Sequence, residues 1–280
     1  MAHPRRPDPA QGVFETLLVL DGRPVELDAH LARLEASLAA LFPTSAAPDP
    51  REAIEARARE IGFGSIRTGI APRGQRRNTD LGAEVESRSA YGSLCTISVH
   101  KEPYTRISLQ SLPLPGGLGA HKWADRSLLD AAQAQLPDDS LPLIVDADGA
   151  ALEASRANVF AVREGALFTP PLDGRILPGI TRMRVLELAG EVEIETAETV
   201  LSVADLLGAD EVFLTGSVRG IEPVSSLDGV ALGGDPAPRD LPVTAQLTED
   251  LRRAWLGAAR SPSPVAGRRP RGRRSPRPVG

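Results

Sequence analysis

The sequence predicts an α+β fold. Short apolar segments typical of strands, such as 12–20 and 211–217, occur in the same chain as amphipathic helical segments such as 27–41. The two kinds do not follow the regular strand–helix–strand order of a doubly wound sheet. The chain has 280 residues, of which 41% are hydrophobic and 25% charged, as expected of a globular protein with one large core or two smaller ones.

The first part of the chain predicts a small α/β unit. Strand 12–20 leads through a turn at 21–23 into helix 27–41, where leucine recurs every three or four residues. Asp49 and Pro50 are a cap and a first-turn proline for a second helix that ends near residue 62. Two strands follow, and the polar segment 71–92 that joins them is long enough to predict partial disorder.

The second part predicts a larger unit of hairpins and helices. A helix is expected at about 122–135, and turns at 146–149 and 163–165 indicate hairpins. Further elements are expected in the order helix from about 180, strand 191–195, helix 202–208, strand 211–217 and helix 244–259. The segment "SLPLPGGLGA" is rich in Pro and Gly and predicts a linker. The predicted division is a flexible N-terminus 1–11, a small α/β domain 12–112, a linker 113–120, a larger domain 121–258 and a disordered tail 259–280.

Composition also limits the function classes. No apolar run approaches the roughly 20 residues of a transmembrane helix, and the first twelve residues lack the apolar core of a secretory signal, so we expect a cytoplasmic protein away from membranes. The single cysteine, Cys95, excludes an intramolecular disulfide. The four histidines are scattered without metal-ligand spacing, and no metal site is predicted.

The charge is unevenly distributed. The last twenty residues carry six arginines and no acid, which leaves 26 basic against 37 acidic residues, a net charge of −11, in the rest of the chain. The body therefore has no general attraction for nucleic acid. The tail is interpreted as a disordered extension, with non-catalytic binding of nucleic acid through it as a remote alternative.

Lys122 is conspicuous because the chain holds only two lysines, Lys101 and Lys122, among 32 basic residues. Arginine stays protonated, whereas a desolvated lysine amine loses its proton and attacks a carbonyl. Lys122 is thus a candidate nucleophile, the alternative being a solvated charge near a helix start.

Two segments are candidates for binding an anion. In "LPGITR" the amides of Ile180 and Thr181 begin a helix without intrahelical partners, and the Thr181 hydroxyl lies beside them. "LTGSVRG" is a turn of small residues directly after a strand, which permits close approach of a ligand to Ser217 and Val218. Arg33 is a candidate for charge-assisted hydrogen bonds to a phosphate. Each segment alone also fits ordinary turn or surface chemistry.

Glu153 is an acid in apolar surroundings between two hairpins. It is either a carboxylate that keeps a heteroaromatic nitrogen protonated or a hydrogen-bonded structural group. Asn158, nearby, is predicted to cap backbone groups with its side chain.

Taken in order, these segments resemble the class IV aminotransferases, which are pyridoxal-phosphate enzymes of fold type IV. The family includes branched-chain and D-amino-acid aminotransferases and 4-amino-4-deoxychorismate lyase. The resemblance runs from residue 12 to about 229 and is carried by "GVFETLLVLDGRPVELDAHLARLEASLAAL", "HKWADRSLLD", "LEASRANVFAVREGALFTPPLDGRILPGITRMRVLELA" and "ADEVFLTGSVRGIEPVSSLDG". It implies two domains, the larger with a mixed sheet like a barrel, and a homodimer acting on a small amino substrate.

The resemblance also implies a role for each candidate. Lys122 matches the lysine that bonds to pyridoxal phosphate, and Glu153 the acid that pairs with the pyridine nitrogen. The remaining matches contact the cofactor phosphate, except that Val218 presents its backbone amide near either the phosphate or the substrate carboxylate. They are Arg33 of the "HxxRL" motif, Ile180, Thr181, Ser217 and Val218.

Within the family, the lysine segment favours the lyase. Branched-chain aminotransferases carry a tyrosine five residues after the lysine, where this chain has Ser127. Arg126 instead matches the K-x-x-x-R pattern of the deoxychorismate lyases, and with Arg67 it is a candidate partner of a substrate carboxylate. We therefore expect a folate-pathway lyase that releases 4-aminobenzoate and pyruvate, the alternative being an aminotransferase. Only eleven residues precede Gly12, fewer than in most relatives, which puts part of the substrate wall in doubt.

Overall fold

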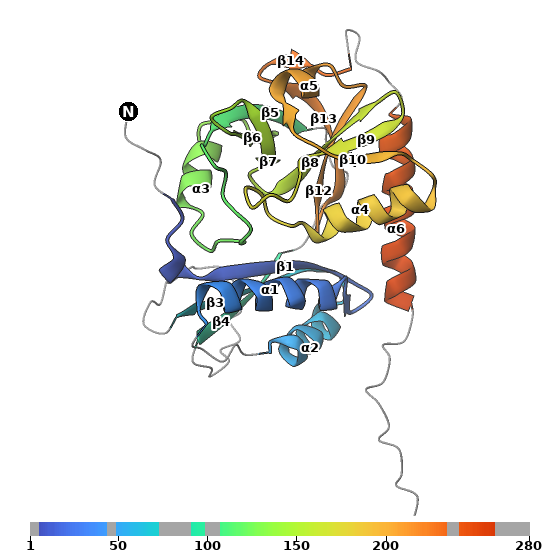
Figure 1. The fold of residues 1–280 in the computed structure, drawn as a ribbon. Helices are drawn as coiled ribbons and strands as arrows, with labels where there is room; N and C mark the ends of the chain where they lie inside the picture. Colours follow the sequence, from blue (N-terminus) through green and yellow to red (C-terminus); the bar gives the residue numbers. More distant parts are fainter. Residues whose placement is uncertain (1–5, 44–48, 73–90, 99–106, 234–240, 261–280) are drawn as a thin grey trace, which may run out of the picture.

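The computed structural model describes residues 6–43, 49–72, 91–98, 107–233 and 241–260. Figure 1 shows a small sheet unit below a larger barrel, with one long helix running along the flank of both. Strands and helices are mixed as the α+β prediction requires.

The small unit is a four-stranded sheet in the order β2-β1-β3-β4. It consists of β1 (Val13–Leu20), β2 (Arg23–Pro24), β3 (Gly64–Pro72) and β4 (Tyr91–Ser98), all antiparallel. A 3₁₀ turn, η1 (Pro9–Gln11), precedes it. Helices α1 (Leu27–Leu41) and α2 (Arg51–Ile61) pack on the sheet through leucine and isoleucine side chains, because each has an apolar face at helical spacing.

The larger unit is a ten-stranded sheet, part of which closes on itself. Strands β5 (Ile107–Pro113), β6 (Ser140–Val145), β7 (Ala150–Ala154), β8 (Ala157–Arg163), β12 (Glu211–Gly216) and β13 (Gly220–Leu227) form a barrel, because β7 also pairs with β8. The remaining strands extend it: β9 (Ala166–Thr169), β10 (Thr196–Glu198), β11 (Leu201–Ser202) and β14 (Val230–Ala231). Its helices are α3 (Ser127–Gln133), α4 (Ile180–Glu191), α5 (Val203–Leu207) and α6 (Pro242–Arg260).

The barrel strands bury both faces. Along β8, Val159 and Ala161 belong to the cluster that fills the barrel, whereas Phe160 and Val162 belong to the cluster beneath α4 and α6. Successive strand residues point to opposite faces, so an almost continuous apolar run here predicts burial on both. The Phe160 and Phe213 rings stack outside the barrel with centroids 5.1 Å apart.

The boundary between the two sheet units differs from the prediction. Strand β5 pairs in parallel with β6 and β13, so residues 107–112, assigned to the small domain, lie in the larger sheet. The segment 113–120 packs against that same unit, where Leu114 is buried and a Cβ on Gly117 would lie 2.1 Å from the Arg175 carbonyl oxygen. Pro and Gly indicate a turn but not which units it separates, and the chain crosses between the sheets earlier, between residues 98 and 107.

Two further boundaries differ, one of a helix and one of a strand. The helix expected from 122 begins at Ser127, because residues 122–124 are hydrogen-bonded to β1 instead. The strand expected at 191–195 lies at 196–198, because α4 continues to Glu191 and the amides of Glu193 and Ile194 donate back to carbonyls in its last turn.

Residues 6–11, expected to be flexible, contact the loop before α3, with the Asp8 amide 3.0 Å from Oδ2 of Asp125. Residues 73–90 of the long connection and the tail from 261 lie outside the described residues.

Candidate active site

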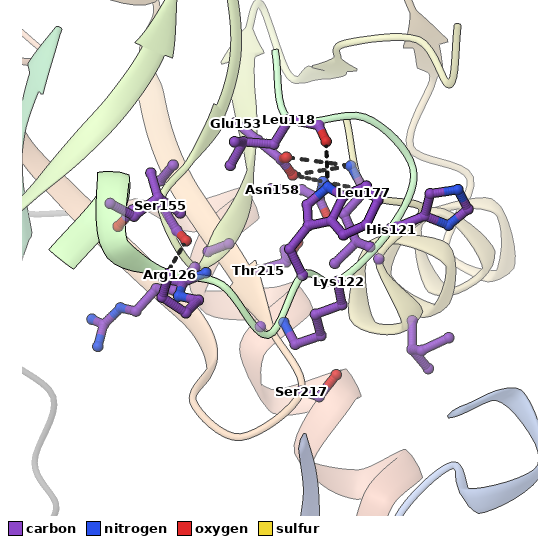
Figure 2. Close-up of a pocket in the computed structure, with 18 of the residues that line it drawn as sticks. Leu118, His121, Lys122, Arg126, Glu153, Ser155, Asn158, Leu177, Thr215 and Ser217 are labelled. Atoms are coloured by element: carbon purple, nitrogen blue, oxygen red, sulfur yellow. Dashed lines mark hydrogen bonds between the residues drawn. The ribbon is translucent and has the colours of Figure 1, made fainter. Parts of the chain in front are cut away.

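One pocket lies between the small sheet and the barrel. Its walls come from α1, the loop before α3, the turn between β7 and β8, the start of α4 and the end of β12. Lys122 and Glu153 both line it, as Figure 2 shows, so the amine and the carboxylate face one cavity. Segments more than ninety residues apart in sequence are thereby brought together.

Lys122 is held on a loop that is attached to β1. The Phe14 amide donates to the Lys122 carbonyl at 2.9 Å, and the Ala124 amide donates to the Gly12 carbonyl at 3.0 Å. Gly12 has φ +82°, and a Cβ there would lie 1.9 Å from the Ile70 carbonyl oxygen, so this position requires glycine. The G-x-F-E-T segment therefore anchors the lysine loop to the small sheet.

The amine of Lys122 is unusually acidic. The pKa of Lys122 is lowered from 10.5 to about 8, first by burial and then by the positive charge of Arg33, while the charge of Glu15 opposes both. The amine is thus partly neutral near physiological pH, as a nucleophile or a proton acceptor requires. The interpretation of Lys122 as a merely solvated charge does not fit this environment.

Glu153 lies on β7 and is buried. It accepts hydrogen bonds from the Leu177 amide, at 3.2 and 3.3 Å from its two oxygens, and from Nδ2 of Asn158 at 3.3 Å. Burial raises the pKa of Glu153 to about 8, although the Leu177 amide and the charge of Lys122 lower it. A carboxylate with this proton affinity is suited to share a proton with a basic ring nitrogen.

Asn158 has the backbone-capping role predicted for it. Its Nδ2 donates to the Leu177 carbonyl at 2.9 Å, and the same amide group touches Glu153. These bonds, drawn in Figure 2, tie the segment before α4 to the two strands that carry Glu153 and Asn158. The acid and the start of α4 are therefore positioned by one network.

Arg33 lines the pocket and is held from behind by Glu15 of β1. Its Nε and one Nη lie 2.8 and 2.6 Å from the two Glu15 oxygens, and its other Nη donates to the Pro178 carbonyl at 2.8 Å. Burial alone would raise the pKa of Glu15, but hydrogen bonds from His30 and Arg33 lower it to about 2. The bidentate pair leaves an N–H on each terminal nitrogen of Arg33 for a phosphate oxygen.

His30 completes this buried cluster. Its Nδ1 lies 2.7 Å from Oε2 of Glu15, and because a carboxylate only accepts, Nδ1 is assigned as the protonated nitrogen. Burial lowers the pKa of His30, although the hydrogen bond to Glu15 and the charge of Glu15 oppose this effect. Sequence reasoning missed Glu15 and His30 as site residues, although both stand within the motifs that carried the resemblance.

The start of α4 and the end of β12 form the remaining wall. Ile180 and Thr181 line the pocket as the first residues of α4, whose N-cap is Gly179, and Ser217 lines it from the turn after β12. Thr215 also lines it, and its Oγ1 is buried without a hydrogen-bond partner in the described part of the chain. Sequence reasoning selected this turn for its small residues but missed Thr215.

Two predicted residues do not line the pocket. Val218 directly follows Ser217, and its side chain packs against the cluster beneath α4 and α6, whereas the expected contact of its backbone amide stays a prediction. Arg67 is exposed on β3, with its guanidinium 4.6 Å from the centre of the Phe14 ring. The Lys122 amine lies 5.1 Å from the same ring, so Phe14 lies against both cations. Arg67 is thus a neighbour of the pocket rather than part of its lining.

Arg126 does line the pocket, and its Nη2 donates to the Ser155 carbonyl at 2.8 Å, as drawn in Figure 2. Arg156, which follows Ser155 in the turn between β7 and β8, lines the pocket as well. Sequence reasoning did not single out Arg156, because arginine is the common cation of this chain and only the pocket distinguishes it.

The donor set fits pyridoxal phosphate. A single pocket holds a lysine amine of lowered pKa and a buried carboxylate of raised pKa. It also holds the first amides of α4 and the Thr215 hydroxyl, which has no hydrogen-bond partner among the described residues. An aldehyde, a pyridine nitrogen and a phosphate are the groups that these residues would hold. The fold and the pocket together define a fold-type IV enzyme that uses this cofactor.

Comparison with known proteins gives the family. Residues 12–227 match the class IV aminotransferase family, and the chain belongs to it. Members of this family depend on pyridoxal phosphate, and so does this enzyme.

Three relatives illustrate the range. The branched-chain-amino-acid aminotransferase of Escherichia coli is 42% identical over 130 residues, which span 46% of this chain but only 41% of that protein. The crystal structure of 4-amino-4-deoxychorismate lyase from Pseudomonas aeruginosa has a TM-score of 0.70 at 26% identity and covers 90% of this chain and 95% of its own. A hypothetical aminotransferase from Mycobacterium tuberculosis, in its PLP-bound form, has a TM-score of 0.71 at 25% identity, with 92% and 95% covered.

No helix in the described ranges combines the length and apolar character needed to cross a bilayer.

Proposed function

We propose that this enzyme is a pyridoxal-phosphate-dependent lyase that converts 4-amino-4-deoxychorismate to 4-aminobenzoate and pyruvate, a step of folate biosynthesis. The observation that carries the proposal is the position of Arg126. It stands four residues after Lys122 and lines the pocket, whereas Ser127, at the position of the aminotransferase tyrosine, is exposed and does not. A pocket cation favours an acidic substrate over a branched aliphatic one.

The positions of the residues in the pocket support the following roles. The cofactor, when bound, withdraws electrons from the substrate carbon that carries the amino nitrogen. Glu153 holds a proton against the ring nitrogen, and Arg33, the amides of Ile180 and Thr181, and Ser217 hold the phosphate. Lys122 removes the proton from the substrate carbon at its Nζ and later returns a proton to the methylene of the departing enolpyruvyl group.

The proposal includes a two-domain enzyme with the site between the domains, a cytoplasmic location, a small amino substrate and a homodimer. Sheet membership supports a two-domain division, since β4, which ends at Ser98, lies in the small sheet and β5, which begins at Ile107, lies in the larger one. The homodimer rests on the family resemblance alone.

Class IV amino transfer to a 2-oxo acid is the second candidate function. The stretch of 130 residues that is 42% identical to a branched-chain aminotransferase favours it. The same pocket residues would serve, because Lys122 would return its proton to the cofactor side instead of to the substrate.

The decisive experiment feeds 4-amino-4-deoxychorismate to the purified enzyme with added pyridoxal phosphate. We expect 4-aminobenzoate and pyruvate in equal amounts, without any need for a 2-oxo acid. A parallel assay offers branched-chain and D-amino acids with 2-oxoglutarate and measures the new amino acid.

One variant tests the role of Arg126 in the lyase reaction. Arg126→Gln should lower kcat/KM for the lyase reaction about ten-fold or more, because it removes a charge-assisted contact. Amino transfer without formation of 4-aminobenzoate would overturn the proposal in favour of the second candidate.

A further inference from the structure

Two arginines on one side of the pocket hold charge that the described neighbours do not fully match. Arg126 lines the pocket, and in the described part of the chain its hydrogen-bond acceptor is a neutral group, the Ser155 carbonyl at 2.8 Å. Arg156 lines the pocket next to it and reaches Glu222 with Nη2, at 3.1 and 3.4 Å from the two oxygens.

Glu222 shares its single negative charge between two arginines. Nη1 of Arg219 lies 3.1 Å from the same Glu222 oxygen that Arg156 contacts, so one buried carboxylate serves two guanidinium groups. Nε of Arg156 is buried and has no hydrogen-bond partner among the described residues. An unpartnered buried donor on a cation is costly unless a ligand supplies an acceptor.

The arginines also act on one another. Burial lowers the pKa of Arg126, and the charges of Arg67 and Arg156 lower it further, whereas the charges of Asp130 and Glu153 oppose this. Clustered cations of this kind concentrate positive potential in a pocket that excludes much of the water. Bringing an anion into the pocket relieves this repulsion.

We propose that Arg126 and Arg156 form a carboxylate subsite, separate from the phosphate cradle of Arg33, α4 and Ser217, and that it selects amino substrates carrying a second acid group. Arg33 is not part of this subsite, because the N–H groups that Glu15 and the Pro178 carbonyl leave on its guanidinium are the ones assigned to the phosphate. The inference rests on the proposed function and deepens it, since it assigns a binding site to a substrate with two carboxylates.

The turn between β7 and β8 gives the subsite a fixed place. The same short turn carries Glu153 at the end of β7, then Ser155 and Arg156, then Asn158 in β8, where Glu153 and Asn158 are paired. The cation is therefore held at a constant offset from the acid that orients the ring. Arg156 therefore lines the pocket from a position only three residues after Glu153.

The test compares two aromatic acids that differ in one carboxylate. Binding of 3-(carboxymethoxy)benzoate and of 3-ethoxybenzoate to the holoenzyme is measured by calorimetry at constant, low chloride. We expect the diacid to bind about ten-fold more tightly or better, since it adds a charge-assisted contact. In Arg156→Gln the two affinities should converge to within about two-fold, while Arg156→Lys keeps part of the preference.

Arg163→Gln is the matched control, because it makes the same charge change at the far end of β8, away from the pocket lining. It should leave the preference for the diacid unchanged. Equal binding of the two acids by the parent enzyme, absence of diacid binding, or an undiminished preference in Arg156→Gln would each overturn the subsite. Binding needs no turnover, so this failure is distinct from failure of the lyase assay.

Discussion

At the residue scale, the site depends on two ionisable groups shifted towards each other. Burial lowers the pKa of Lys122 to about 8 and raises that of Glu153 to about 8, so each is near the point where it exchanges a proton at physiological pH. Like many functional pairs, they are perturbed in opposite directions by the same dry surroundings. Glu15 and His30 add a buried support that fixes Arg33.

The lysine shift predicts how the cofactor-free enzyme takes up pyridoxal phosphate. Because only the neutral amine attacks an aldehyde, the initial rate of uptake should rise with pH, reach half of its maximum near pH 8 and level off above it. An ordinary lysine would place that midpoint above 10. The rate is followed by the yellow colour of the bound cofactor across a series of buffers.

The control is Lys122→Arg, which keeps a positive charge but cannot bond to the aldehyde. It should retain no cofactor after borohydride treatment and dialysis, whereas the parent should retain a bleached, covalent adduct. Uptake by the parent with a midpoint near that of a solvated lysine would contradict the burial argument.

At the element scale, the start of α4 is fitted closely to β8. A Cβ on Gly179, the N-cap of α4, would lie 1.9 Å from Oδ1 of Asn158. The φ of Gly179 is −70°, so the need for glycine here is a matter of space and not of backbone conformation. Asn158 in turn contacts Glu153 and the Leu177 carbonyl, so the proposed ring acid and the proposed phosphate site at the start of α4 are coupled through one side chain.

Gly179→Ala should therefore weaken binding of pyridoxal phosphate about ten-fold and lower the free energy of unfolding by about 1–3 kcal/mol, as overpacking typically does. Affinity is measured by titrating the cofactor-free variant, and stability by urea unfolding without cofactor.

Gly190→Ala in the same helix is the control, since nothing lies within 4 Å of a Cβ there. It should leave affinity unchanged and raise stability by up to about 1 kcal/mol, because alanine favours the helix. Unchanged affinity in Gly179→Ala would show that Asn158 has room to move.

At the scale of the whole molecule, the pocket lining and the buried core of the described residues lie before the end of α6. The pocket is lined by residues between 7 and 217, and the last buried hydrophobic residue in the described chain is Trp255. Glu211 accepts the first amides of α6, from Val243 at 3.1 Å and Thr244 at 2.8 Å, so the helix is fixed at its start. Its apolar side packs with α4 on the barrel.

Removing residues 261–280 should therefore leave cofactor affinity, catalysis and the midpoint of urea unfolding unchanged. Ending the chain after residue 249 removes Leu251 and Trp255 and should cost several kcal/mol of stability, about 2–5 kcal/mol for each large side chain lost. The same pair of proteins tests the remote alternative. If the full chain binds RNA but never pyridoxal phosphate, and the shortened chain binds neither, the enzyme interpretation is wrong.

The sequence by itself predicted much of this protein. The α+β class, most helices and strands, the family, the cofactor and the helix start at Ile180 follow from local periodicity, turn chemistry and motif order, which a linear chain records directly. The sequence also predicts seven site residues that line one pocket in the structure: Lys122, Glu153, Arg33, Ile180, Thr181, Ser217 and Arg126.

Only the tertiary structure decided which distant residues share that pocket. Strand pairing placed β5 in the barrel and bonded the lysine loop to β1. It also set Glu15 against Arg33. The pocket lining then includes Thr215 and Arg156 but not Arg67 or Val218. The physical reason is that a side chain's direction depends on register and closure of the sheets, and a shift of one residue reverses its face. Local sequence holds no record of that choice.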